Sequence, residues 1–223
     1  MNGNEVFRGN GCEVEEDYYR HSHVNVQGVM VENHCMLSDT RGRKDNVALE
    51  EWLVAEAQRC LAVGDGAVVW PSADFSAVFL NWHAEAHFMF EQIQLRHIID
   101  WALFLKCEGA RMDVEGFRSL KGRFTFGRLS DILTSIALDF LGLEEEEVPA
   151  ELVADARAVD LRLRDRVLNY IMVAERTDRS GGVWRQRWRI LCRGFRDEWK
   201  FREVFGLSGW KVLGRKGWGV IWK

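Results

Sequence analysis

Residues 78–107, VFLNWHAEAHFMFEQIQLRHIIDWALFLKC, form a helical pattern from which the rest of the chain can be placed. Apolar residues recur there at spacings of three and four, and neither Pro nor Gly interrupts them. We therefore predict the central helix, or a pair of helices broken near Gln92, of a helical domain. The polar residues of this stretch that could carry chemistry include His83, Glu85, His87, Glu91, Arg96, His97 and Asp100.

Two pairs in this stretch stand one helical turn apart. His83 and His87 have the spacing at which two imidazoles can share a metal ion. However, the glutamate between them is not where the H-E-x-x-H motif of zinc proteases requires it. We therefore expect hydrogen-bonded histidines in a partly polar core, with no shared metal. For Arg96 and Asp100 we expect a semi-buried ion pair that orients the helix.

The bulk composition narrows the class of protein. The chain has 223 residues, of which 47% are hydrophobic, so it can build one large domain or two small ones. A formal net charge of -4 argues against a nucleic-acid binder that is basic throughout. Five cysteines without a C-x-x-C pair favour reduced thiols. With no signal peptide and no apolar run long enough for a membrane span, we expect a cytoplasmic protein.

A β-hairpin is predicted near the N-terminus. Residues 18–26 and 29–37 have strand patterns on either side of a turn-forming Asn-Val-Gln-Gly sequence. In the second strand, Met30, Glu32 and His34 share one face because side chains alternate along a strand. A carboxylate and an imidazole on one face can serve a metal. They can equally belong to a half-exposed surface strand.

The remaining pattern is mainly helical. Together with the hairpin it predicts an α+β fold, in which a small antiparallel sheet is followed by a helical bundle. The predicted helices cover residues 47–63, 78–107, 113–120, 124–143 and 149–175. The predicted domains are 1–63, with the sheet and first helix, 64–182, with the bundle, and 183–223, a basic tail.

The tail mixes arginines and lysines with six tryptophans. Such a composition can bind nucleic acid or an anionic membrane surface. It can equally form a C-terminal helix whose tryptophans pack on the bundle beneath arginine stems. The tryptophans are Trp184, Trp188, Trp199, Trp210, Trp218 and Trp222.

A family resemblance covers roughly residues 5–145. The residues that carry it are His83-x3-His87-Phe88, Glu91 and Leu95-Arg96-x3-Asp100-Trp101. This pattern resembles a helical segment of the uncharacterised bacterial nucleotidyltransferases, although Gln92 stands where that family usually has Gly. The resemblance implies transfer of a nucleotide from an NTP to an unknown acceptor, with Mg²⁺ as cofactor.

The resemblance also assigns a role to the second strand of the hairpin. Val31-Glu32-Asn33-His34 matches a strand whose acidic residue is the third metal carboxylate of the fold, so Glu32 is the candidate ligand and His34 its neighbour. The first two carboxylates belong to an Asp-x-Asp after a Gly-Ser loop. The chain contains neither motif, and no Gly-Ser precedes Glu13-Val14-Glu15.

Two of the three metal carboxylates are therefore not found in the sequence. We expect either a fragment or a protein that has lost the catalytic half, inactive as it stands. The alternative is a non-catalytic interaction module, or a binder of nucleic acid or anionic surfaces that acts through the tail.

Overall fold

The computed structural model of the chain describes residues 3–15, 21–34, 36–38, 44–63, 69–90, 93–173, 192 and 196–208. The chain divides into two compact units, Met1–Trp70 and Pro71–Lys223. The first contains a three-stranded antiparallel sheet and the second contains helices, so the predicted α+β fold is confirmed.

The first unit is built on the predicted β-hairpin. Its elements are α1 (Gly3–Gly9), β1 (Val14–Glu15), β2 (His21–Val26), β3 (Val29–His34) and α2 (Lys44–Val63). The sheet has the order β1-β2-β3. Gln27 and Gly28 join β2 to β3 with φ of 52° and 83°. Positive φ at both central residues is the conformation of the tight turn that matches the twist of paired strands.

The register of the hairpin fixes which residues share a face. Val24 pairs with Val31, and His23 pairs with Glu32. The Val24 face is buried at that position, where only 1% of Val24 is exposed. Asn4 of α1 binds residues of this face, since its Oδ1 accepts hydrogen bonds from Ser22 Oγ at 2.5 Å and from Asn33 Nδ2 at 2.7 Å. The opposite face carries Glu32, as predicted.

The second unit is a bundle of helices. Its elements are α3 (Ala73–Phe90), α4 (Leu95–Glu108), η1 (Gly109–Arg111), α5 (Val114–Arg123), α6 (Gly127–Phe140), η2 (Glu145–Glu147), α7 (Ala150–Arg157), α8 (Leu161–Met172) and η3 (Lys200–Val204). The quoted stretch is thus a helix pair whose break lies between Phe90 and Leu95, as expected. Ser72 Oγ accepts a hydrogen bond from Phe75 N at 3.0 Å and so caps the start of α3.

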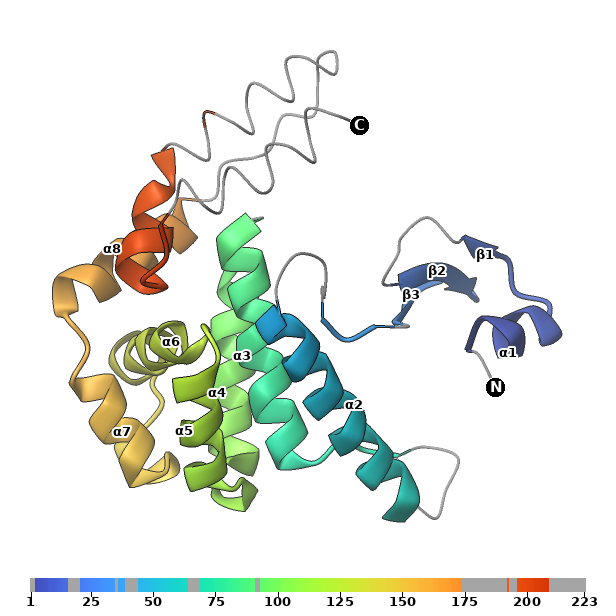
Figure 1. Cartoon of the computed structure of the whole chain (residues 1–223), viewed down its shortest axis with the longest axis horizontal. Helices are drawn as coiled ribbons and strands as arrows, with labels where there is room; N and C mark the ends of the chain where they lie inside the picture. The colour runs from blue at the N-terminus through green and yellow to red at the C-terminus, as the bar shows by residue number, and fades with distance from the viewer. Residues whose placement is uncertain are drawn as a thin grey trace. The chain divides into compact units, whose positions relative to one another are not determined.

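The centre of the bundle is α6. It packs against α3, α4, α5, α7 and α8, and Figure 1 shows it nearly end-on among its neighbours. Residues around its whole circumference are buried, which is typical of a helix enclosed by others. Thr134 accepts a 2.9 Å hydrogen bond from Trp101 Nε1, which joins α6 to α4. The central position predicted for residues 78–107 therefore belongs to α6.

One predicted helix is wrong. Residues 149–175 were expected as a single long helix, but α7 ends at Arg157 and α8 begins at Leu161. Asp160 starts the new helix, because its Oδ1 accepts a 2.9 Å hydrogen bond from Arg162 N. The apolar pattern runs through this break, so periodicity alone did not reveal it.

The C-terminal tail predicted for residues 183–223 falls largely outside the described residues. Trp199, within the described part, is 9% exposed, and the guanidinium of Arg166 lies 4.2 Å above its ring. Among the helices that the structure describes, none is both long enough and apolar enough to cross a membrane.

Candidate functional site

Glu32 lies on the outward face of β3, and 52% of its side chain is exposed. Its two carboxylate oxygens face two imidazoles. His23 Nε2 of the neighbouring strand is 3.6 Å from Oε1, and His34 Nε2, two residues further along β3, is 3.4 Å from Oε2. The predicted residues Glu32 and His34 are therefore neighbours in space.

A second carboxylate stands in the same row of the sheet. Glu15 of β1 pairs with His23, which in turn pairs with Glu32. With two strand spacings between them, the Cα atoms of Glu15 and Glu32 are about 10 Å apart. The sheet therefore presents two carboxylates, Glu32 and Glu15, in one row on the same face.

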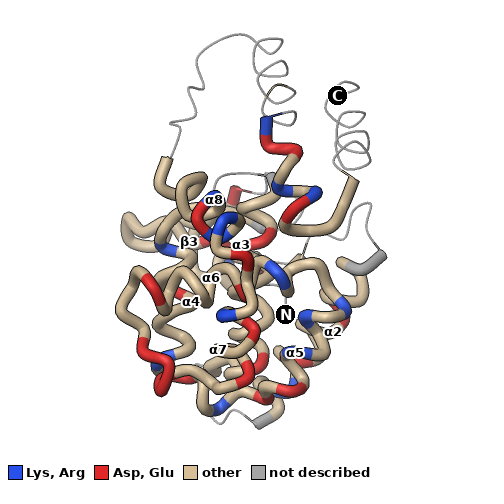
Figure 2. Tube along the Cα trace, turned by 90° about the vertical axis from the view of Figure 1, so that its left-hand side faces the viewer, with Lys and Arg blue, Asp and Glu red and all other residues tan. Residues whose placement is uncertain are grey.

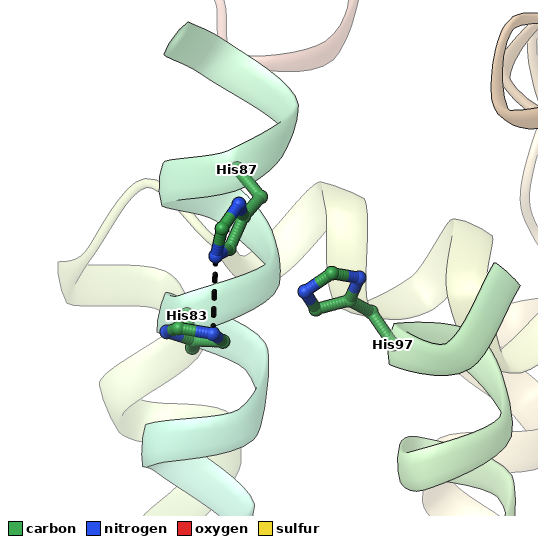
Figure 3. A group of neighbouring side chains, drawn as sticks. All are labelled: His83, His87 and His97. Carbon is green, nitrogen blue, oxygen red and sulfur yellow. Dashed lines mark hydrogen bonds between the residues drawn. The ribbon is translucent and has the colours of Figure 1, made fainter. Parts of the chain in front are cut away.

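Three histidines converge in the helical unit (Figure 3). His83 and His87 come from successive turns of α3, and their Nε2 atoms are hydrogen-bonded to each other at 3.1 Å. His97 comes from the first turn of α4, and its ring centroid is 4.7 Å from that of His87. One nitrogen of each ring lies within 4.8 Å of the others. His83 and His87 were expected to be hydrogen-bonded, and the structure shows that they bond to each other; the third histidine is an addition.

His97 is the most buried of the three, with 6% of the residue exposed. Burial lowers its pKa below the usual value, because the charged imidazolium loses its hydration. A backbone hydrogen bond with Gln94 opposes this effect, and the charges of His87 and Arg96 reinforce it. The neutral ring is therefore the favoured form of His97 at neutral pH.

The two nitrogens of His97 differ in their partners. Nδ1 accepts a hydrogen bond from Gln94 N at 3.1 Å and lies equally close, 3.1 Å, to the carbonyl oxygen of Gln94. Nε2 is buried and has no hydrogen-bond partner among the described residues. Such an atom is uncommon, because most buried polar atoms are satisfied. Figure 3 shows one ring nitrogen of His97 directed toward His83 and His87.

The predicted ion pair between Arg96 and Asp100 is wrong. Both residues are exposed, and no ion pair between them is found in the described part of the chain. The reason is which side of α4 packs against the rest of the bundle. Its buried residues are His97, Ile98, Trp101, Ala102, Phe104 and Leu105. Positions 96 and 100 lie on the other side of the helix, where water competes for both charges.

The sequence did not predict that His97 joins the pair on α3. His97 lies ten positions after His87, and no helical spacing relates them. Only the return of the chain between Phe90 and Leu95 brings the start of α4 beside α3. A usable signal was the break itself, because a polar residue in the first turn after a break can face the preceding helix.

The chain was compared with known proteins. No curated protein and no solved structure matches it. Among family descriptions, that of the uncharacterised nucleotidyltransferases matches residues 3–142, which include the hairpin, all three histidines and α6. Because this match covers more than half of the 223 residues, the chain belongs to the uncharacterised nucleotidyltransferase family.

Proposed function

We propose that this protein is a nucleotidyltransferase-like member of a family that transfers a nucleotide from an NTP to an acceptor, and that Glu32 corresponds to one of the carboxylates that hold Mg²⁺ in a complete site. The observation that carries the proposal is the setting of Glu32 within the matched family region. It stands on an outward strand face with its side chain half exposed, where a ligand can approach from solvent.

We further propose that these 223 residues do not by themselves complete the two-metal site. Two Mg²⁺ ions neutralise the triphosphate and position the attacking and leaving oxygens, which requires several converging carboxylates. Mg²⁺ keeps its waters unless several oxygens replace them. Among the described residues, the imidazoles of His23 and His34 lie within 3.6 Å of the Glu32 oxygens, and Mg²⁺ prefers oxygen ligands.

The test combines calorimetric titration of ATP with Mg²⁺ and a transfer assay with a labelled nucleotide. For the 223-residue chain we expect no transfer and no micromolar Mg²⁺-dependent binding. Binding of that strength, abolished in Glu32→Gln but retained in Glu51→Gln on the exposed side of α2, would show that other residues do complete the site. The Glu15→Gln variant would then show whether the second carboxylate of the row contributes.

The same measurements address the role of Glu32. Weak Mg²⁺ binding that is equal in wild type, Glu32→Gln and Glu51→Gln would contradict the role of Glu32 as a ligand. Loss of that weak binding in Glu32→Gln alone would support it. No observation specifically favours nucleic-acid binding instead, because both signs of charge are interspersed along the described helices (Figure 2).

A further inference from the structure

We propose that His83, His87 and His97 form a binding site for a divalent first-row transition-metal ion, with Zn²⁺ as the best-suited ion. This site is distinct in chemistry from the Mg²⁺ site proposed at Glu32, because its ligands are nitrogens. It reverses the expectation from the pair on α3 alone, which was that the two imidazoles share no metal because the glutamate between them does not fit the zinc-protease motif. The third ligand, from α4, makes the set sufficient.

The distances fit a metal site after a small adjustment. With Zn–N bonds of 2.0–2.1 Å, the nitrogens of a tetrahedral site are roughly 3.3 Å apart. The Nε2 atoms of His83 and His87 are already 3.1 Å apart. One nitrogen of each of the three rings lies within 4.8 Å of the others, so an approach of at most about 1.5 Å closes the set. A change in side-chain torsions supplies such a movement without a shift of either helix.

The hydrogen bonding of His97 suits a ligand. In metal sites the second ring nitrogen of a histidine commonly donates its proton to a backbone carbonyl. His97 Nδ1 lies 3.1 Å from the carbonyl oxygen of Gln94, which provides that acceptor. Nδ1 can accept from Gln94 N, but with a metal bound the proton would lie on Nδ1 and be donated to the Gln94 carbonyl oxygen instead, which leaves the lone pair of Nε2 for the ligand bond. A metal ion would thereby satisfy the buried Nε2, which has no partner among the described residues.

The chemistry of the ligand set selects the metal. Three imidazoles without a carboxylate favour Zn²⁺, Ni²⁺ or Cu²⁺ over Mg²⁺ and Ca²⁺, which prefer oxygen. Three histidines also leave one coordination position for water or an added ligand. His83 and His87 are only half-buried, so an ion can approach from their side. A bound ion would cross-link α3 to the first turn of α4.

The experiment uses the whole 223-residue chain with any purification tag of histidines removed. The protein is stripped with a chelator, loaded with Zn²⁺ or Co²⁺, and passed through a desalting column. We expect about one equivalent of retained zinc and, for Co²⁺, the intense visible absorption of a tetrahedral site. Mg²⁺ in excess should displace neither ion. Retention of far less than one equivalent of zinc by the wild type would overturn the proposal.

Variants locate the ion. His87→Gln and His97→Gln should each lose zinc retention and the Co²⁺ absorption. His34→Gln, which removes a histidine from the exposed face of β3, should keep both. Zinc retained in His87→Gln and His97→Gln but lost in His34→Gln would place the ion on the sheet and overturn the proposal.

A further measurement covers the case in which a histidine variant fails to fold. Alkylation of histidines in the wild type is followed by peptide mass spectrometry, with and without one equivalent of Zn²⁺. The proposal requires Zn²⁺ to slow modification of His83 and His87 and to leave that of His34 unchanged. Equal modification rates with and without the ion would refute it.

Discussion

The ammonium group of Lys200 donates a 2.8 Å hydrogen bond to the backbone carbonyl oxygen of Phe88, which lies 112 positions earlier in the chain. Phe88 is in the last turn of α3, where backbone carbonyls lack partners within the helix. Lys200 is only 1% exposed and also contacts Tyr170 and Asp197. Residues beyond the matched family region therefore anchor the end of α3.

Replacement of Lys200 by Met should destabilise the protein. Asp197 is 3% exposed and lies 3.1 Å from Lys200 Nζ, so the variant would bury a carboxylate without its main counter-charge. The loss of one partner from a buried pair typically costs about 3–5 kcal/mol, and Arg196 and Tyr170 soften that cost here. Urea denaturation should show this loss of stability as a lower midpoint. Lys106→Met, which breaks the exposed pair with Glu147, should change the midpoint little.

The hydrogen bond between Trp101 and Thr134 should be detectable by a double-mutant cycle. Thr134 is 2% exposed, so Thr134→Val leaves the indole N–H of Trp101 buried without an acceptor. We expect a loss of about 1–3 kcal/mol in the free energy of unfolding. Trp101→Phe removes the donor, so the two substitutions together should cost less than the sum of their separate costs. Strict additivity would show that the bond contributes nothing.

Two glycines offer a matched test of packing. A Cβ on Gly127 would lie 2.5 Å from the backbone oxygen of Lys121, whereas a Cβ on Gly122 would meet nothing within 4 Å. Gly127→Ala should therefore cost about 1–3 kcal/mol through overpacking. Gly122→Ala, in the last turn of α5, should instead be neutral or add up to about 1 kcal/mol. Thermal unfolding of both variants checks the contrast.

The fold was largely predictable because its patterns are local. Alternation and a turn sequence gave the hairpin, and the strand period placed Glu32 and His34 on one face. Helical spacing gave the helix pair on either side of Gln92. The break before Asp160 was missed because apolar spacing continues through it, and only a capping side chain marks the new start.

The candidate sites were less predictable because they depend on contacts distant in sequence. The spacing of Arg96 and Asp100 permits an ion pair, but it does not say which side of α4 is buried. Likewise, His83 and His87 could be paired from sequence, whereas His97 joins them only through the packing of α4 against α3. The sequence shows which side chains could bind a metal ion or form an ion pair, but it does not show which of them come together in space.

Lys121 pairs with two carboxylates in the helical unit. Its ammonium group forms ion pairs with Asp131 of α6 and, at 2.9 Å, with Asp155 of α7, and its side chain is 8% exposed. Burial raises the pKa of Asp131 despite the pairing with Lys121. For Asp155, burial also acts to raise the pKa, but hydrogen bonds from Arg118 and Lys121 outweigh it and the pKa is lowered.

These opposite shifts give the Lys121→Met variant a defined pH dependence. The lowered pKa of Asp155 contributes stability above its unfolded pKa, and that contribution is lost as pH falls through the folded pKa. The raised pKa of Asp131 has the opposite sign, so stability is lost as pH rises through its folded value.

Without Lys121, both carboxylates should have higher folded pKa values, because the positive charge that favours their ionised forms is gone. Lys121→Met should therefore lower the free energy of unfolding by roughly 1–3 kcal/mol at pH 7. The loss is moderate because Asp131 and Asp155 are only partly buried. The difference from wild type should shrink as pH falls from 7 through the raised pKa values that the two carboxylates have in the variant. Urea denaturation at several pH values measures it, with Arg118→Met as the control that removes only the exposed partner of Asp155. A difference that stays constant from pH 7 to pH 3 would show that Lys121 stabilises the bundle through its aliphatic stem and not through its charge.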